Sequence, residues 1–474
     1  MIRPHQRAAT RMVLPALAAV AFAIMPIRDT RATAPFVIEV ADPGPAFVGM
    51  FSSLALDSQG NPRISYYDDD DGNLKYASRS VAGVWTREVA DGSTSVVGWY
   101  SSLAIDGSNV PHISYYNVTT GRLWYAKKPG VLWTKEQVDG LDSDVGTDCN
   151  IRLDGSGLPG ISYYDFTNQN LKYAHRSAGG VWTAENADES EDDSGRFSSL
   201  AFDGSGNPCI SYYNSSTGQL MYARKSGGVW SHEVVDPSTD NRGQFSSLRI
   251  DGAGRPCISY YDANNQDLLY AWKNGASWVI ETANGAEDLD VGRESALALD
   301  IAGGPHITFY DNTNQHWLYA HKVGGAWQTM TVDATFNVRG QFGSIQMTAG
   351  GIPRMSCFDA TAATLLYAYG PSENVSVGDR PRTSIASLSV FPNPSPAGVT
   401  RIHWVGEGLA PDAAVDILDA GGRRIRRLPL DASGEARWDG TDDRGRAVRA
   451  GINFVKPVGV AAASVSAVRL VVVR

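Results

Sequence analysis

The feature that most constrains this 474-residue chain is a short phrase that recurs along it. Pro62 begins the first copy, Pro-Arg-Ile-Ser-Tyr-Tyr-Asp, and Pro353 begins the seventh, with successive copies 48 or 49 residues apart. A period this regular means that one supersecondary unit is repeated, and it decides the fold before any single residue does.

Each unit reads as four short strands separated by turn signals. In the first unit, the β-rich run 52–56 leads through the turn residues 57–62 into the strands 63–67, 74–77 and 85–89. No apolar stripe with a 3.6-residue period occurs, so helices are not expected. Four antiparallel strands in about 48 residues match one blade of a β-propeller. The sequence therefore predicts an all-β, seven-bladed propeller.

The ends of the repeat array predict that the ring is closed. The fourth-strand phrase, in which a Trp follows a Gly by two or three residues, occurs in six units, and the seventh unit stops near Ala368 without one. Residues 36–42 align with residues 85–91 of the first unit. We therefore expect this N-terminal segment to supply the outer strand of the last blade, which removes the exposed edges of an open array. The first strand of each unit is then innermost, and the paired tyrosines belong to the core.

The N-terminus has the pattern of a secretory signal peptide. Arginines precede an apolar run at 12–27, and Ala32-Thr33-Ala34 offers a cleavage site, so residues 1–34 are predicted to be removed. The apolar run is shorter than a membrane-spanning helix, and no other stretch is long enough to span a bilayer. The mature protein is therefore predicted to be secreted or held at the outer cell surface, without a transmembrane segment.

Composition narrows the possible partners. The chain has a formal net charge of −10, and its acidic excess lies in the repeat region, so it lacks the basic surface that a nucleic-acid partner needs. The four cysteines follow no zinc-binding spacing. Cys209 and Cys257 hold the same position in adjacent units, where neighbouring sheets lie too far apart for a disulfide, so free buried thiols are expected.

The sequence pattern changes after the repeats. We predict a propeller at 35–370, a linker at 371–387 and a second domain at 388–474, which reads as a small β-sandwich of short strands joined by hairpin turns. Its Asp442-Asp443 pair is interpreted as turn chemistry, with calcium the one cofactor left open.

Several motifs of this second domain occur together: Phe-Pro-Asn-Pro at 391–394, Asp-Ile-Leu-Asp-Ala-Gly-Gly-Arg at 416–423, Trp-Asp-Gly-Thr-Asp-Asp-Arg-Gly at 438–445, Ala-Gly-Ile at 450–452 and the closing run at 468–474. The combination resembles the C-terminal sorting domain of type IX secretion substrates and the related immunoglobulin-like domain of flagellar hook-capping proteins. The resemblance implies an immunoglobulin-like fold that engages the secretion machinery. Asn453 departs from the family, which usually has an aromatic residue there.

The repeats resemble bacterial secreted repeats of the Asp-x-x-Gly-x-Pro-x-Ile-Ser-Tyr-Tyr type and, more distantly, sialidase-like and propeller-lectin blades. Residues 57–60 match only the Asp-x-x-Gly turn of the sialidase Asp-box, and no Glu–Tyr pair or arginine triad can be carried over.

Chemistry in a repeat ring should show as a unit that breaks the pattern. The clearest breaks are 147–152 in the third unit and 347–349 in the seventh, and we interpret both as drift between repeats. The first contains Cys149 without a neighbouring histidine. His306 and His321 could meet across a hairpin as a metal site. Because unrelated residues replace His306 in the other units, a packing role is favoured and no metal site is predicted.

The turns between the second and third strands share one face of the ring with the variable crossings between units. Carboxylate and amide groups dominate there with interspersed aromatics, a mixture that suits sugars. The candidate ligand-binding residues open these turns: Asp68, Asn117, Asp165, Asn214, Asp262 and Asp311. The alternative is that they only form Asx-turns.

Three classes of function remain open. The leading interpretation is a binding or adhesion module for an extracellular glycan or protein, ahead of a purely structural surface protein and a glycan-acting hydrolase or lyase. The sequence identifies no catalytic residue and does not name the ligand.

Overall fold

The computed structural model describes residues 36–44, 47–238, 240–285, 289–333, 337–370, 387–391, 400–405, 409–419, 422–431, 434–460 and 468–472. Every regular element within these ranges is a β-strand, and no helix there could cross a membrane. The predicted signal peptide at 1–34 lies outside the described residues, as does the predicted linker except for Ser387.

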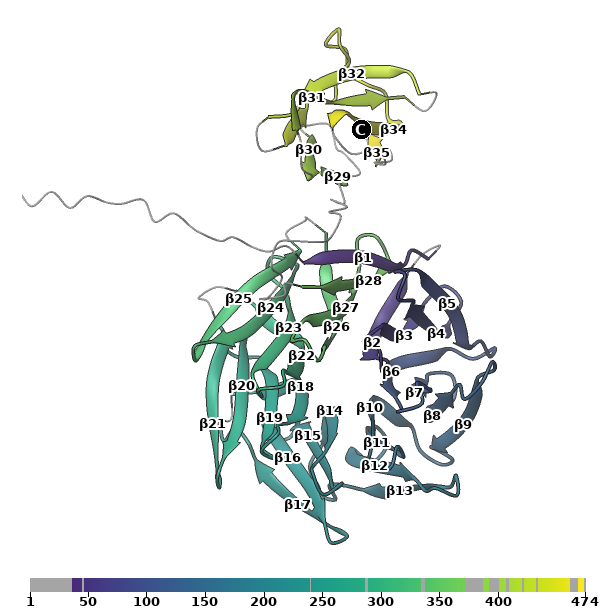
Figure 1. Cartoon of the computed structure of the whole chain (residues 1–474), viewed down its shortest axis with the longest axis vertical. Helices are drawn as coiled ribbons and strands as arrows, with labels where there is room; N and C mark the ends of the chain where they lie inside the picture. The colour runs from purple at the N-terminus through teal and green to yellow at the C-terminus, as the bar shows by residue number, and fades with distance from the viewer. Residues whose placement is uncertain are drawn as a thin grey trace, which may run out of the picture. The chain divides into compact units, whose positions relative to one another are not determined.

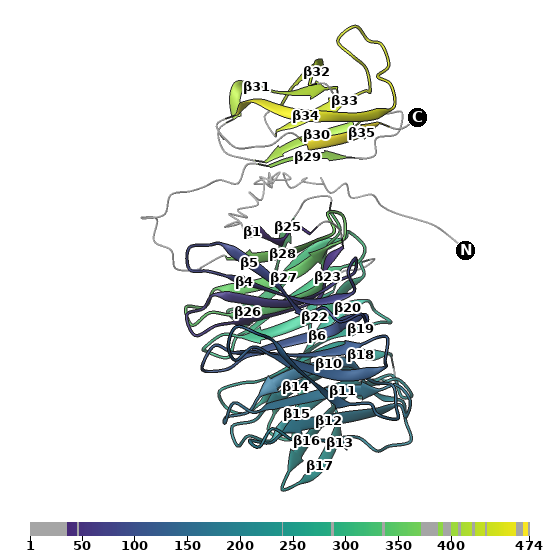
Figure 2. The same cartoon turned by 90° about the vertical axis from the view of Figure 1, so that its right-hand side faces the viewer.

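The first 28 strands form seven four-stranded antiparallel sheets arranged as a ring, which confirms the predicted propeller (Figure 1). From the axis outward, the first blade contains β2 (Val48–Leu56), β3 (Pro62–Asp68), β4 (Asn73–Arg79) and β5 (Trp85–Asp91). Figure 2 shows the same blades from the side.

The next five blades repeat this order of strands: β6 (Val97–Ile105), β7 (Pro111–Asn117), β8 (Arg122–Lys127) and β9 (Thr134–Asp139); β10 (Val145–Leu153), β11 (Pro159–Asp165), β12 (Asn170–Arg176) and β13 (Trp182–Asn186); β14 (Ser194–Phe202), β15 (Pro208–Asn214), β16 (Gln219–Ser226) and β17 (Val229–Val234); β18 (Arg242–Ile250), β19 (Pro256–Asp262), β20 (Asp267–Asn274) and β21 (Ser277–Asn284); and β22 (Val291–Leu299), β23 (Pro305–Asp311), β24 (His316–Val323) and β25 (Ala326–Asp333). The seventh blade contains β26 (Arg339–Met347), β27 (Pro353–Asp359), β28 (Thr364–Tyr369) and, outermost, β1 (Val37–Asp42).

The N-terminal strand closes the ring with the contacts of an ordinary fourth strand. β1 pairs antiparallel with β28, as predicted. Phe36 lies edge-on to Tyr319 of the sixth blade at 5.4 Å between ring centroids. The fourth-strand tryptophans meet a tyrosine of the preceding blade in the same way, at 5.2 to 5.6 Å. Glu39 accepts the indole N–H of Trp85 at 3.0 Å and pairs with Arg79 at 2.7 Å.

The first tyrosine of each pair is buried between blades, as expected for a core residue. The Tyr66 hydroxyl donates a 2.6 Å hydrogen bond to Asp42 of β1, and burial together with this carboxylate raises the pKa of Tyr66. Four further blade contacts use the same bond: Tyr115 to Asp91, Tyr163 to Asp139, Tyr212 to Asp188 and Tyr260 to Asp236. The repeated tyrosines thus hold the blades together.

Adjacent inner strands meet at seams that side-chain hydrogen bonds hold together. Between the first two blades, Ser101 Oγ donates to Phe51 O at 2.8 Å, and Ser53 Oγ accepts from Leu103 N at 3.0 Å. Equivalent pairs of bonds hold five other seams. Among the described residues, the seam between the sixth and seventh blades has neither bond, because Ala296 and Gly343 replace the serines.

A glycine near the start of each inner strand allows the blades to approach closely. Gly195 has a φ of +115°, and a Cβ there would lie 2.7 Å from Leu171 Cα of the preceding blade. Only glycine tolerates both the backbone conformation and this contact.

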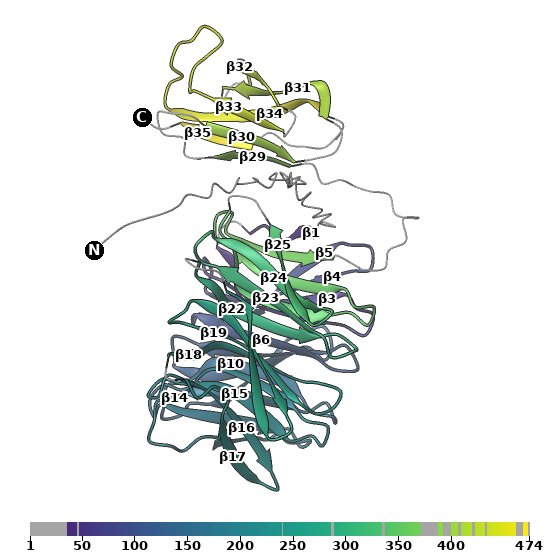
Figure 3. The same cartoon turned by 90° about the vertical axis from the view of Figure 1, so that its left-hand side faces the viewer.

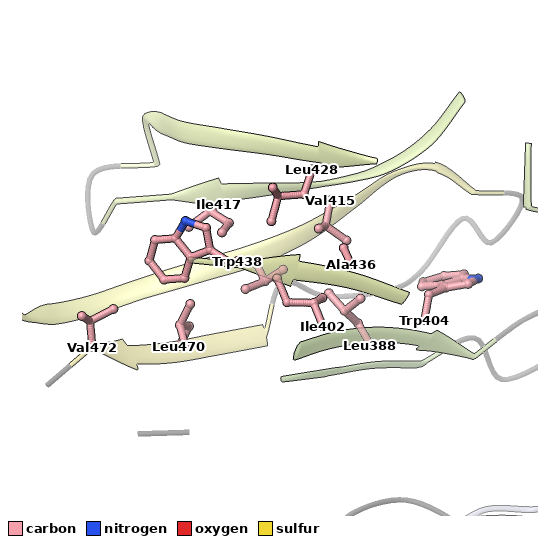
Figure 4. Close-up of a cluster of buried hydrophobic side chains, with 11 residues drawn as sticks. Leu388, Ile402, Trp404, Val415, Ile417, Leu428, Ala436, Trp438, Leu470 and Val472 are labelled. Atoms are coloured by element: carbon pink, nitrogen blue, oxygen red, sulfur yellow. The ribbon is translucent and has the colours of Figure 1, made fainter. Parts of the chain in front are cut away.

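The C-terminal strands form a two-sheet sandwich (Figure 3). One sheet contains β29 (Ser387–Phe391), β30 (Thr400–Val405) and β33 (Glu435–Trp438), and the other contains β32 (Arg424–Pro429), β31 (Leu409–Leu418), β34 (Gly451–Val460) and β35 (Val468–Val472). Figure 4 shows Trp438, Ile417, Val415 and Leu470 in the core between them. The β-sandwich is as predicted, while its assignment as immunoglobulin-like stays a prediction.

Candidate functional site

The seven inner strands surround a cavity of about 280 Å³ at the axis of the ring. Its lining residues come from one strand of each blade, namely β2, β6, β10, β14, β18, β22 and β26. The volume is close to the lower end of the range for small-molecule sites. This axial cavity is the candidate site. Every blade contributes residues to its lining, so a substitution in one blade can place a functional group there that the other repeats do not have.

One residue of each inner strand is turned toward the axis by a β-bulge. The pairing with the second strand shifts register there, and the residue has a left-handed backbone with φ between 51° and 54°. This conformation is uncommon for bulky side chains, and bulges of this kind re-aim a side chain. We call these seven cavity-lining residues the axial ring: Phe51, Tyr100, Asp148, Phe197, Phe245, Glu294 and Phe342.

The aromatic members of the axial ring form two arcs. Phe51 lies between Phe342 and Tyr100, at 4.6 and 5.0 Å between ring centroids. Phe197 and Phe245 form the second arc at 4.7 Å. In chain order, Asp148 and Glu294 stand between the arcs, so the ring alternates apolar surfaces with single carboxyl groups.

Burial controls the protonation of both carboxyls. Burial raises the pKa of Asp148 to about 6, although the Phe197 N–H and the charge of Arg196 act in the opposite direction. Burial likewise raises the pKa of Glu294 to about 7, against the Phe342 N–H, which donates to the carboxylate, and the charge of Arg293. Each carboxyl therefore gains or loses its proton near neutral pH and has a guanidinium nearby.

The axial ring lies toward the face that was predicted to bind a ligand. The start of each inner strand pairs with the end of the second strand, as Val48 does with Asp68, so both lie at the loop-bearing face. Further along the inner strand, two arginines and a glutamine line the same cavity toward the opposite face: Arg152, Arg249 and Gln346.

The six predicted ligand residues lie beneath the turns that they open. Their exposed fractions range from 1% to 5%: Asp68, Asn117, Asp165, Asn214, Asp262 and Asp311. In each, a side-chain oxygen accepts the backbone N–H three residues on, as Asp311 does from Asn314 at 2.8 Å. Such bonds form Asx-turns, which was the alternative interpretation. None of the six is among the described residues that line the cavity, and their role in binding stays a prediction.

The cysteines and histidines have packing roles. All four cysteines are free and buried, as predicted. Cys149 takes the serine position of its seam and donates to Tyr100 O at 3.1 Å, and burial raises its pKa to about 12, so the thiol stays protonated. His306 contacts the Tyr319 hydroxyl and Asp300, as His112 does with the equivalent residues of the second blade.

Carboxylates elsewhere serve as turn acceptors. Asp442 of the sandwich accepts the backbone N–H groups of Arg444 and Arg446, both at 2.9 Å, which is the turn chemistry predicted for the Asp442-Asp443 pair. Across the described residues, no group of three or more His, Cys, Asp or Glu side chains could hold a metal ion.

Fold and cavity together define the class: a seven-bladed β-propeller with an axial cavity, followed by a β-sandwich. No protein-family model matches the chain, and neither does any curated protein. Among solved structures, the chain is similar to PorZ, an essential surface component of the type IX secretion system of Porphyromonas gingivalis, with a TM-score of 0.44 and 12% identity over 90% of this chain. The match spans 59% of the PorZ chain.

Two lyases are also similar in structure. A streptogramin B lyase has a TM-score of 0.49 and 9% identity over 70% of this chain and 97% of its own. The polysaccharide lyase Uly1 has a TM-score of 0.44 and 9% identity over 69% of this chain and 90% of its own.

Most of the cavity chemistry was missed by the sequence reasoning. The break at 147–152 was noticed but interpreted as drift, although it contains Asp148 and Arg152. The repeat pattern does not single out Glu294 or Arg249, because each is a single substitution in a strand that otherwise largely keeps the pattern. Comparing the seven repeats at the residue before the serine pair would have found both acids, since the other five units have Phe or Tyr there.

Proposed function

We propose that the protein is an extracellular binding module that takes a carbohydrate unit at the mouth of its axial cavity. The observation that supports this proposal is the axial ring, in which Asp148 and Glu294 interrupt two aromatic arcs. Aromatic rings pack against the C–H surfaces of sugars, and carboxyl groups accept hydrogen bonds from their hydroxyls. The size of the cavity suits one sugar unit better than a chain of several.

Two arginines near the acids add hydrogen-bond donors. Arg196 Nη2 lies 3.3 Å from the Tyr164 hydroxyl, and Arg293 Nε lies 3.0 Å from Asp290, so both guanidinium groups are held in place at the loop-bearing face. A guanidinium has five N–H donors, and these contacts leave several for a ligand. The six predicted turn residues would contribute by fixing the turns around this mouth.

A glycan array probed with the full-length protein tests the proposal. We expect binding to a defined set of glycans, and Asp148→Ala or Glu294→Ala should weaken it at least tenfold by calorimetry. Asp70→Ala, which changes an exposed carboxylate on the loop-bearing face, is the matched control and should bind like wild type. Absence of glycan binding, or equal binding by all three variants, would overturn the proposal and favour a purely structural surface role.

A glycan-acting hydrolase or lyase is the second candidate, for one reason. The raised pKa values of Asp148 and Glu294 bring two carboxyls into the range where proton transfer at neutral pH is efficient. Incubation with each glycan that binds should then release new reducing ends or unsaturated products. Turnover that disappears in Asp148→Asn would support catalysis, and binding without turnover would support the binding module.

We infer that residues 388–474 direct the protein out of the cell. The inference rests on the motif resemblance of this segment and on its change of fold after the propeller. A fusion of residues 385–474 to a periplasmic reporter should reach the surface of a host with type IX secretion. A reporter that stays in the periplasm would contradict the export role and leave the proposed binding site untouched.

A further inference from the structure

Two arginines line the axial cavity toward the face opposite the axial ring. Arg152 lies on β10 of the third blade and Arg249 on β18 of the fifth. Alanine occupies the equivalent position in four other blades: Ala55, Ala104, Ala201 and Ala298. Gln346 of the seventh blade takes the same position and adds an amide.

Neither arginine has a carboxylate partner among the described residues. Each donates through Nη1 to the carbonyl of the residue before it, at 2.7 Å, and no other bond or ion pair of these side chains is found there. Most other propeller arginines form ion pairs, including Arg224 with Asp203 and Arg293 with Asp290. Asp148 lies four residues from Arg152 along the strand. At 3.3 Å per residue, their Cα atoms are about 13 Å apart, which places the two side chains at different levels of the cavity.

The two guanidinium groups make this part of the cavity strongly positive. Burial lowers the pKa of Arg152 to about 10, and burial with the nearby charge of Arg152 lowers the pKa of Arg249. An arginine surrounded by protein stays protonated near neutral pH, and an unpaired charge there is unfavourable until an opposite charge arrives. Both residues line the cavity, and each guanidinium has one hydrogen bond among the described residues, which leaves several N–H donors for a planar or tetrahedral oxyanion.

We propose that Arg152 and Arg249 form an anion-binding site in the axial cavity, which takes a small oxyanion such as a carboxylate, phosphate or sulfate group. Gln346, which also lines the cavity, supplies an additional donor. The site lies apart from the axial ring, so it does not depend on the carbohydrate proposal.

Thermal unfolding of the full-length protein at pH 7 and constant ionic strength tests the site. Phosphate, sulfate and glucuronate are titrated separately, with chloride as the balancing anion and glucose as the uncharged counterpart of glucuronate. A ligand that binds only the folded state raises Tm with its concentration in a saturable way. We expect saturable stabilisation by at least one of the three oxyanions, and a tenfold or greater loss of apparent affinity in Arg152→Gln and in Arg249→Gln.

The controls separate the site from a general salt effect. Arg255→Gln changes an arginine of the same face that is 51% exposed and paired with Asp251, and it should respond like wild type. Without anions, the Tm of Arg249→Gln should be no lower than that of wild type, because the substitution removes an unpaired charge. If Arg249→Gln fails to fold, Arg249→Met replaces it in the test.

The three anions also distinguish the source of the oxyanion. Stabilisation by phosphate or sulfate identifies an inorganic-type anion, and stabilisation by glucuronate alone identifies a sugar carboxylate. No saturable response to any of the three, or a response unchanged in both cavity variants, would overturn the proposal.

Discussion

The two carboxyls of the axial ring should make the protein less stable as the pH rises toward 8, and removing their charge should abolish this effect. The perturbation is the double variant Asp148→Asn, Glu294→Gln. Both replacements keep the size of the side chain and an oxygen that can accept the Phe197 and Phe342 N–H groups. Asn also tolerates the left-handed backbone of position 148.

The size of the effect follows from the raised pKa values. A pKa of about 6 for Asp148 and about 7 for Glu294, against ordinary values of about 3.9 and 4.3, correspond to at most about 3 and 4 kcal/mol when both groups are ionised. Both side chains border the cavity, and solvent there screens part of the penalty. We therefore expect about 2–4 kcal/mol for the pair.

The sign follows from proton linkage. A raised pKa in the folded state means that the folded protein holds these protons more tightly than the unfolded chain does. The free energy of unfolding of the wild type is therefore highest below about pH 4. It falls by the contribution of these two groups as the pH rises to about 7, and it stays at the lower value above that. The double variant should match the wild type at pH 4 and exceed it by the full amount at pH 8.

Urea unfolding monitored by tryptophan fluorescence at pH 4.5, 6, 7 and 8 measures the difference. The control pair Asp70→Asn, Glu189→Gln removes two exposed carboxylates, so it changes the net charge equally without touching the cavity. A difference between double variant and wild type that does not change with pH, or that the control pair reproduces, would refute the reasoning.

Three further predictions concern the architecture. Deletion of residues 36–42 should cost several kcal/mol of stability or cause aggregation, because it exposes the edge of the last blade; a truncated monomer that melts like wild type would contradict the closure. Gly195→Ala should destabilise by about 2–4 kcal/mol in urea unfolding, because its Cβ would meet Leu171, whereas Gly206→Ala, which has open space around it, should cost less. Cys149→Ser should leave the free energy of unfolding within about 0.5 kcal/mol of wild type, since five other blades have serine there; rapid labelling of the native thiol would contradict its burial.

The architecture could be predicted because every repeat expresses the same requirement. The alignment of residues 36–42 with 85–91 predicts the outer strand of the last blade, and the structure confirms it through the pairing of β1 with β28. Local turn chemistry also follows from the sequence, since Asp165 and Asp311 accept backbone N–H groups of the turns that they open.

The cavity could not be predicted in the same way, because its chemistry arises from departures from the repeat. Phe51 and its counterparts have left-handed backbones at a bulge, a conformation to which Phe and Tyr give no local clue. Arg249 replaces an alanine in an otherwise unchanged strand, and only the ring brings it near Arg152, 97 positions earlier in the numbering. Residues from separate blades meet at the axis, and a single unit contains no sign of this meeting.

The seam between the sixth and seventh blades has a consequence for how the ring opens. Among the described residues, the inner strands at six seams share at least two side-chain hydrogen bonds, whereas those at this seam share a single bond between Glu294 and the Phe342 N–H. The ring therefore has one weak seam, and thermal fluctuations should open this seam more often than the other six. After correction for intrinsic exchange rates, amide hydrogens of β22 and β26 should exchange with deuterium sooner than those of β6 and β10. The difference should grow at a pH where Glu294 is ionised, because opening of the seam returns the buried carboxylate to water. A ring of seven nearly equal blades would thus open locally at one seam, and the frequency of opening would depend on pH.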